Sequence, residues 1–443
     1  MKRVTYFGLW LLSSLQYFLR ERLTAAGWLV FAAAATAAAV GIDTSRTMSY
    51  QMFALLATLL AAAFAAAPFF RPRVSVQRDL PRYATAGEAF EYRVTVENRG
   101  KRALSGVSLA EVPRDPRPSY REWLAAREPG EERRNWFDRT QGYFRWRWLI
   151  ERRSPERPRE APLGTLAPGA RARLKLSLKP RRRGRVELAG LALARSDSLG
   201  LARALARLRA PGAVIALPRR YRLPAITLPG RRRFQQGGVT LATSVGDSEE
   251  FIGLREYRPG DPLQRVHWKS SARARTPIVK EFQDEFFERH ALILDTSTGR
   301  GEDAAFEEAV AVAASFVYAI DTRECLLDLL FVGGELRTYT AGRGQLHMEH
   351  MLEVLAGVRS SAPDEFGQLS RAVLAQRRAL SSCIAVLLSW DPARQGFVQA
   401  LAASGLELRV LVVAERQALA SEPPAGILVL HPGEVEAGLA GLR

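Results

Sequence analysis

Two long uncharged apolar runs near the start of the chain limit most strongly what it can fold into. Thr24–Ile42 form the first run and Met48–Phe70 the second, with a polar turn at residues 43–47 between them. As a helix, the nineteen residues of the first run span roughly 28 Å, close to the thickness of a hydrocarbon core. We therefore predict a hairpin of two transmembrane helices, whose many alanines allow close packing. The alternative is a pair of buried helices in a soluble protein.

Basic residues flank both runs and predict how the hairpin is oriented. The flanking basic residues are Lys2, Arg3, Arg20 and Arg22 before the first run, and Arg71, Arg73, Arg78 and Arg82 after the second. The intervening turn carries one Arg and one Asp. Because basic flanks stay in the cytoplasm, we expect both termini and the main body of the chain there, at the bacterial inner membrane.

The segment before the first run is apolar but contains Ser13, Ser14 and Gln16. These polar residues favour a helix lying in the membrane interface over a third span. A cleaved signal peptide is not expected, because a second apolar run follows at once.

The middle of the chain has the alternating pattern of β-strands. Apolar and polar residues alternate in VSVQRDL, AFEYRVTVEN, ARARLKLSLKP and GRVELAGLALARS, separated by turns rich in Gly, Asn and Pro. We predict an immunoglobulin-like β-sandwich over residues 71–218. Residues 113–160 interrupt it with a nearly balanced set of charges, which predicts a solvated insert. Within this insert, YFRWRW alternates and is predicted as a strand; stacking on bases or lying on lipid are alternatives.

The charge balance bears on the partners of the chain. There are 64 Lys and Arg against 46 Asp and Glu, a net charge of +18, and nearly all of the basic residues are arginine. A GC-rich genome accounts for this bias without an anionic partner, so nucleic acid is not the expected ligand. Cys325 and Cys383 both lie in apolar runs, which excludes a disulfide-stapled secreted fold.

The most informative stretch is EEFIGLREYRPGDPLQRVHWKSSARARTPIVKEFQDE, residues 249–285. Asp261 is suited to cap a short helix from Pro262 to Ala272, and TPIVKEF is predicted as a strand. Donors and aromatic rings gather here, which suits either an anion site or a packing element. We predict an interaction motif made of Arg255, Glu256, Tyr257, Asp261, His267, Trp268, Lys269, Arg273 and Lys280.

This stretch resembles the hallmark segment of the family called domain of unknown function 58, in which a similar GLREY-PGD---HW--SAR-----KEF string follows a membrane hairpin and a β domain. RRRG…SLGL, from Arg181 to Leu201, is also similar to that family. The resemblance implies a partner of the MoxR-type AAA+ ATPase class. It implies no activity, because the family's molecular function is largely unassigned.

The last part of the chain alternates short apolar strands with helices. ALILD, CLLDLLFVGG, CIAVLLSWD, LELRVLVV and GILVL are predicted as strands, and residues 303–320, 345–356 and 366–380 as helices. ELRTYTA is predicted as a hairpin partner of the second strand. This order indicates a doubly wound α/β sheet, in which ligands bind at the carboxyl ends of the strands.

Two of these strand ends carry oxygen ligands. The pattern DTSTG after the first strand and SWD after a later one resemble the metal-ion-dependent adhesion site of von Willebrand factor A domains. The resemblance implies a Mg²⁺ site at Asp295, Ser297 and Asp391, with hard oxygen ligands as this ion prefers. Gly299 stands where the pattern has serine, and Ser360 and Ser361 are weak candidates for its intermediate-loop threonine. Helix capping by Asp295 and Ser297 is the alternative.

Taken together, the sequence predicts a membrane-anchored interaction or scaffold protein, not an enzyme. Its predicted parts are an interfacial helix at 1–23, two spans in 24–70, the sandwich, the hallmark segment at 219–289 and a von Willebrand A-like domain at 290–443. No P-loop, nucleophile elbow or HExxH motif occurs, and no motif indicates a small-molecule substrate. Alternatives are a binder of an anionic polymer and a hydrolase that uses His267 with Glu256 or Asp261.

Overall fold

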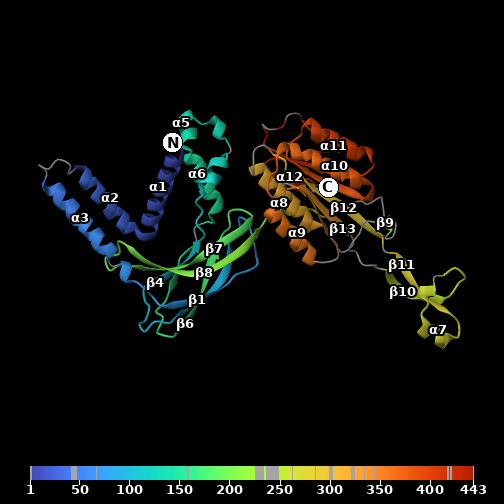
Figure 1. Cartoon of the computed structure of the whole chain (residues 1–443), viewed down its shortest axis with the longest axis horizontal. Helices are drawn as coiled ribbons and strands as arrows, with labels where there is room; N and C mark the ends of the chain where they lie inside the picture. Colours follow the sequence, from blue (N-terminus) through green and yellow to red (C-terminus); the bar gives the residue numbers. More distant parts are fainter. Residues whose placement is uncertain are drawn as a thin grey trace. The chain divides into compact units, whose positions relative to one another are not determined.

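The computed structural model divides the chain into two compact units (Figure 1). Unit 1 contains residues 1–219 and unit 2 nearly all of the rest. The structure describes residues 2–40, 47–65, 67–128, 130–156, 159–224, 234–235, 249–261, 263–284, 286–298, 303–320, 325–333, 335–342, 345–416, 419 and 422–442.

Unit 1 begins with three helices, α1 (Lys2–Arg22), α2 (Ala25–Val40) and α3 (Thr47–Ala65). One stretch, Met48–Phe69, is helical, long and apolar enough to cross a membrane, and only 12% of its apolar window is buried. Helix α2 is apolar but shorter, with 16 residues. Among the described residues the structure thus supports one candidate span; the second span stays a prediction.

The junction between α1 and α2 is fixed to the β domain of unit 1. Leu23 pairs with Ala202 in a β-bridge, and the backbone N–H of Thr24 donates to the carbonyl of Leu201 at 3.1 Å. A side chain at Gly27 would place its Cβ 2.0 Å from that same carbonyl oxygen. Only glycine allows this close approach, so the start of α2 is held tightly against the turn before β8.

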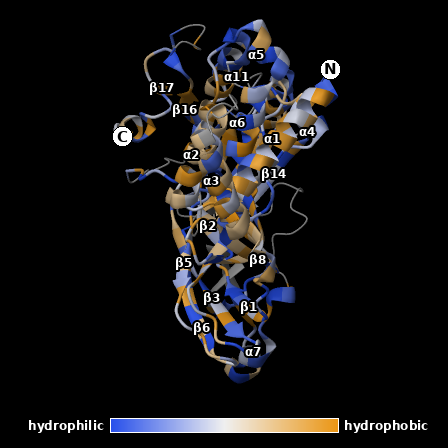
Figure 2. Ribbon diagram, turned by 90° about the vertical axis from the view of Figure 1, so that its left-hand side faces the viewer, coloured by the Kyte–Doolittle hydropathy of each residue, from blue (hydrophilic) through white to orange (hydrophobic). Residues whose placement is uncertain are grey.

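The β domain is a sandwich of two sheets, as predicted. One sheet has the order β1-β3-β6 and the other β2-β8-β7-β4-β5. Apolar residues from both sheets share one core, which includes Val94, Leu109, Leu176 and Leu191. Figure 2 shows hydrophobic and hydrophilic residues following one another along these strands, as half-buried strands require. The strands are β1 (Val74–Asp79), β2 (Tyr83–Thr85), β3 (Phe90–Asn98), β4 (Val107–Pro113), β5 (Ala161–Leu163), β6 (Arg171–Leu178), β7 (Gly184–Ser196) and β8 (Arg203–Leu217).

The insert at residues 113–160 forms helices that pack together around a small apolar core. The prediction of a solvated loop with a strand is therefore wrong. The insert contains α4 (Tyr120–Ala125), a 3-10 turn at Glu131–Arg133, α5 (Trp136–Gln141) and α6 (Tyr143–Arg153). Trp123, Trp146 and Leu149 are buried in a cluster with Tyr6 of α1. The YFRWRW segment lies in α6 because Trp146 and Leu149, three residues apart, reach the same side of a helix.

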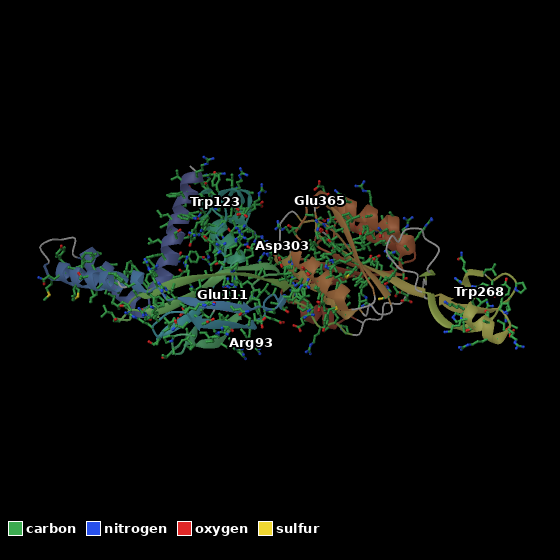
Figure 3. All side chains as sticks on the ribbon, turned by 60° about the horizontal axis from the view of Figure 1, so that its bottom comes forward. Arg93, Glu111, Trp123, Trp268, Asp303 and Glu365 are labelled. Atoms are coloured by element: carbon green, nitrogen blue, oxygen red, sulfur yellow. The ribbon has the colours of Figure 1, made fainter. Side chains whose placement is uncertain are left out.

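Three buried polar side chains, Arg78, Tyr92 and Glu111, form a trio in the sandwich, where Figure 3 labels Glu111. Glu111 of β4 accepts a hydrogen bond from the hydroxyl of Tyr92. Arg78 of β1 lies 3.0 Å from its other carboxylate oxygen, and both side chains are almost fully buried. Burial raises the pKa of Glu111 from near 4.5 to about 7, although the hydrogen bond from Tyr92 and the charge of Arg78 oppose the rise.

This trio predicts that the sandwich loses stability between pH 4.5 and 7. The pKa of Glu111 is higher in the folded state, so its contribution is complete below about pH 4.5 and is lost as the pH rises through 7. The expected loss is about 3 kcal/mol. Glu111→Gln keeps an acceptor for Tyr92 but cannot titrate. Urea unfolding at pH 5 and pH 8 should differ for the wild type, and differ less for the variant; equal pH dependence contradicts the assignment.

Unit 2 contains a six-stranded sheet of order β14-β13-β12-β15-β16-β17, with β9 (Phe234–Gln235) pairing β12 outside this path. All neighbours along the path are parallel except β14, which runs antiparallel to β13 at the edge. The strands are β12 (Phe286–Leu294), β13 (Cys325–Val332), β14 (Leu336–Ala341), β15 (Ser382–Leu387), β16 (Glu407–Val413) and β17 (Leu428–Leu430). The strands predicted for this region are therefore present, including the hairpin pair β13–β14.

Helices cover both faces of this sheet. Helix α8 packs on β12, β15 and β16 on one face. Phe366 and Phe397, from α10 and α11, belong to the core on the other face. The helices are α8 (Ala304–Ala319), α9 (Gln345–Gly357), α10 (Phe366–Gln376), α11 (Pro392–Ala403) and α12 (Val435–Ala440). This is the doubly wound arrangement that the sequence predicts.

A separate two-stranded sheet carries the hallmark segment. It contains β10 (Glu249–Glu256) and β11 (Ile278–Asp284), with α7 (Trp268–Ala274) between them. We call residues 249–284 the arm; Figure 1 shows α7 at its outer end. The predicted strand is present, but the helix begins at Trp268, later than predicted, and a 3-10 turn at Leu263–Arg265 precedes it.

Candidate functional site

The first candidate site lies at the carboxyl edge of the six-stranded sheet. Strands β12 and β15 are neighbours in its centre, and the chain leaves them in opposite directions along the sheet. Asp295 and Ser297 follow the end of β12, and Asp391 follows the end of β15. This is the switch point at which doubly wound sheets bind ligands. The structure therefore brings the three predicted metal ligands to one place.

Asp295 is completely buried and fully bonded. Its carboxylate accepts hydrogen bonds from the backbone N–H of Ser297 at 2.9 Å and of Leu388 at 3.1 Å. The hydroxyl of Ser297 also donates to it. Asp295 thus ties the end of β12 to the residue that follows β15.

An arginine that the sequence analysis missed stands among the predicted ligands. Arg394, in the first turn of α11, is only 6% exposed. Its Nε donates to Asp295 at 2.8 Å, and its Nη2 donates to the hydroxyl of Ser297 at 2.8 Å and to the Ser297 carbonyl at 3.0 Å. Its Nη1 forms an ion pair with Asp391. One guanidinium therefore joins all three predicted ligands.

Opposite charges favour the ionised forms of Arg394 and Asp391. Burial opposes the charge of Arg394, but the charges of Asp295 and Asp391 outweigh it and raise the pKa of the guanidinium. Burial likewise tends to raise the pKa of Asp391, but the backbone N–H and the guanidinium of Arg394 lower it overall. The side chain of Asp391 also caps α11 through the backbone N–H of Arg394, at 3.0 Å.

The residues at this edge do not fit a Mg²⁺ ion while Arg394 is in place. The guanidinium occupies the carboxylate and hydroxyl oxygens that would coordinate the ion, and it supplies the positive charge itself. No group of three or more His, Cys, Asp or Glu residues suited to a metal occurs in the described part of the chain. Gly299 lies outside the described residues. Magnesium binding therefore requires Arg394 to leave, and it stays a prediction.

Ser361 lies at the same edge. It pairs with Ser297 in a parallel β-bridge, and its hydroxyl lies 3.1 Å from that of Thr296. Its backbone N–H donates to the carbonyl of Thr296 at 2.8 Å. Of the two serines considered for the intermediate loop, Ser361 is thus placed beside the predicted ligands.

The second candidate site is the arm, which holds every residue of the predicted interaction motif. Arg255 binds both carboxylate oxygens of Asp261, at 2.7 and 2.8 Å, and Asp261 also accepts from the backbone N–H of Arg258. The hydrogen bond from Arg255 is the main cause that lowers the pKa of Asp261 to about 2. Asp261 therefore closes the turn before α7 instead of capping the helix.

His267 also has a structural role. Its Nδ1 lies 2.7 Å from the hydroxyl of Ser270, and its backbone N–H donates to the carbonyl of Ile278 at 2.8 Å. Val266 and Val279 are buried beside it. These contacts hold α7 against β11 and give His267 a partner other than the carboxylate that the hydrolase alternative requires.

The outer surface of the arm is apolar and basic. Trp268 is 71% exposed and Leu263 68% exposed, and Figure 3 shows Trp268 at the outer end of the arm. Lys269 and Arg273 are exposed on the same short helix, and Glu256 on β10. Tyr257, just beyond the outer end of β10, and Lys280 on β11 are half-buried.

Comparison with known proteins identifies the second half of the chain. Residues 253–438 match the family model described as "Protein of unknown function DUF58". This segment belongs to the DUF58 family. The DUF58 region begins in the arm and ends in the last helix, so it contains both candidate sites.

A curated relative of this chain is "Uncharacterized protein YeaD" of Bacillus subtilis, 29% identical over 144 residues. The match covers 32% of this chain and 35% of the relative, so it spans about a third of that protein's length.

Solved structures give weaker likenesses. The CARDB domain of PF1109 from Pyrococcus furiosus is 11% identical, and the match covers 33% of this chain and 94% of that domain, with a TM-score of 0.17. An ASH/PapD-like domain of human CEP192 is 14% identical over 33% of this chain and 87% of its own, also at 0.17. Neither likeness is close enough to carry an argument.

Proposed function

We propose that this protein is a membrane-anchored scaffold whose arm docks a partner protein. The anchor is the pair α2–α3, oriented with both termini and the body in the cytoplasm. The sandwich is the stalk, and the domain behind the arm is von Willebrand A-like. Exposure of Trp268 and Leu263 at the outer end of the arm is the observation that carries the proposal.

The surface of the arm has the composition of a binding site. Large apolar side chains are costly to expose, and Trp is enriched among the residues that contribute most to binding at protein interfaces. From Arg255 to Lys280 the chain has seven basic and two acidic residues. The surface therefore suits a partner with an apolar socket surrounded by acidic groups.

The internal bonds of the arm support the same view. Arg255 with Asp261, and His267 with Ser270, fix the turn and the helix from within. A surface that is already ordered loses little conformational entropy when it binds. The resemblance to the family names the partner class, a MoxR-type AAA+ ATPase.

The proposal is tested with the full chain in detergent and a purified MoxR-type ATPase from the same organism. Trp268→Ala is expected to weaken binding by about 30-fold, as removal of a central hot-spot residue does. Trp136→Ala is the matched control, because Trp136 is 78% exposed in unit 1, and it should leave affinity unchanged. Equal binding of wild type and Trp268→Ala contradicts the proposal.

Salt dependence separates protein docking from the anionic-polymer alternative. Binding of a polyanion by the arm should fall steeply as the salt concentration rises, and loss of Lys269 and Arg273 should affect it more than loss of Trp268. Docking through an apolar socket should instead lose more affinity when Trp268 is replaced than when Lys269 and Arg273 are replaced. The same variants measure both cases.

A further inference from the structure

A cavity lies within unit 1, between α1 and the sandwich. Its volume is about 500 Å³. The second half of α1 lines one side of the cavity and β8 of the sandwich lines the other. Arg117, from the segment that leads into the insert, also lines it. The lining residues are Ser14, Tyr17, Phe18, Glu21, Arg22, Arg117, Leu205 and Arg207.

The polar part of this cavity is basic. Three arginines and one glutamate line it. Arg207 pairs with Glu21 at 2.7 Å, and Arg117 donates to Asp115 at 2.9 and 3.0 Å. The guanidinium of Arg22 lies 4.9 Å from the centre of the Phe18 ring. The hydroxyl of Tyr17 adds a further donor, whereas that of Ser14 already donates to the carbonyl of Trp10 and accepts from Arg117. The guanidinium groups are therefore what suits the lining to phosphate oxygens.

The apolar part of the cavity adjoins the anchor. Phe18 stacks on Phe64 of α3, with ring centres 6.2 Å apart. The cavity therefore lies at the end of α3 that is followed by basic residues, the end that the charge rule places at the cytoplasmic surface. The exposed side chains of Leu11 and Leu15 continue the apolar surface along α1.

We propose that this cavity binds the phosphate of an anionic phospholipid, whose acyl chains lie along α3. Its basic lining, its apolar rim and its place beside the candidate span together match the basic pockets that hold lipid headgroups. The proposal rests on the membrane anchoring proposed above, but not on docking through the arm. A soluble phosphate ester has the same polar chemistry and is the alternative source.

The test uses the full chain in nanodiscs, with thermal unfolding and native mass spectrometry of retained lipid. Wild type should unfold at a higher temperature in discs containing phosphatidylglycerol than in discs of phosphatidylcholine alone. In Arg22→Gln/Arg207→Gln this gain should disappear, and retained phosphatidylglycerol should fall by roughly 30-fold, about fivefold per arginine. Arg171→Gln, an exposed arginine of the sandwich with its side chain 70% exposed, is the matched control.

Several outcomes overturn the proposal. An equal gain from phosphatidylglycerol in the wild type and the double variant excludes this cavity as the lipid site. If glycerol phosphate stabilises the wild type in phosphatidylcholine discs as much as the anionic lipid does, the lipid assignment is wrong. If the double variant is unfolded in both discs, Arg22→Gln alone decides, because Arg22 contacts the ring of Phe18 at the cavity wall. Failure here leaves anchoring and docking through Trp268 unaffected.

Discussion

Arg394→Ala is expected to lower the free energy of unfolding of the α/β domain by about 3–5 kcal/mol, because it leaves a buried carboxylate without its partner. Asp295 is completely buried, and Arg394 is the only cation that bonds to it among the described contacts. The same substitution also removes two hydrogen bonds to Ser297 and the ion pair with Asp391. Urea unfolding, followed through the buried Trp390 near the site, measures the effect.

The control for this prediction is Arg371→Ala. Arg371 lies on α10, and its Nε donates to the carbonyl of Gly367 at an exposed position. Its loss should change stability by less than about 0.5 kcal/mol, as exposed substitutions usually do. A cost at Arg394 as small as the cost at Arg371 would mean that the guanidinium does not hold the strand ends together.

Arg394→Ala also tests whether the carboxyl edge of the sheet can bind Mg²⁺. In Arg394→Ala the oxygens of Asp295, Ser297 and Asp391 lose their cation, so excess Mg²⁺ should recover part of the lost stability. Wild type should gain none, because the guanidinium holds those oxygens. If Mg²⁺ stabilises the wild type and Asp295→Asn abolishes the gain, the predicted metal site is supported and Arg394 must be displaced by the ion.

The sequence predicts the α/β domain well because its signals are local. Buried parallel strands are short apolar runs, and Asp303 stands where a cap is needed, its side chain accepting from the backbone N–H of Phe306 at 2.9 Å. The position of Asp295, directly after a strand, also places it at the ligand-binding edge. These features need no knowledge of distant residues.

Arg394 shows why the chemistry of the site is harder to predict. An arginine three residues after Asp391 resembles any charged residue in the first turn of a helix. Its role depends on Asp295, 99 residues away in the chain, and only the folded sheet brings the start of α11 and the end of β12 together. A signal exists in principle, since Asp391 and Arg394 are spaced to pair on one helix.

The insert illustrates a second limit. YFRWRW alternates like a strand, but it forms a helix that packs against Tyr6. The ring of Tyr6 lies 5.4 Å from that of Trp146. The hydroxyl of Tyr6 also donates to the carbonyl of Pro118 at 3.0 Å. A contact with the first helix of the chain selects the helical form, and no pattern within residues 113–160 reveals that partner.

Leu55→Arg is expected to remove the chain from the membrane, because an arginine near the middle of a spanning helix costs about 2.5–3.5 kcal/mol on insertion. Leu55 lies on α3 and is 57% exposed in unit 1, so its side chain faces outward where lipid would be. Carbonate extraction of cell membranes measures the change. Wild type should stay in the pellet, and the variant should appear in the soluble, aggregated or degraded fractions.

Two controls identify the cause of that loss. Leu55→Ala keeps an apolar residue and should stay in the pellet. Leu263→Arg places the same charge on the arm, where Leu263 is 68% exposed, and should also stay in the pellet. If Leu55→Arg resists extraction as well as the wild type does, α3 does not cross the bilayer. The 12% burial of its apolar window would then indicate a surface that another protein covers.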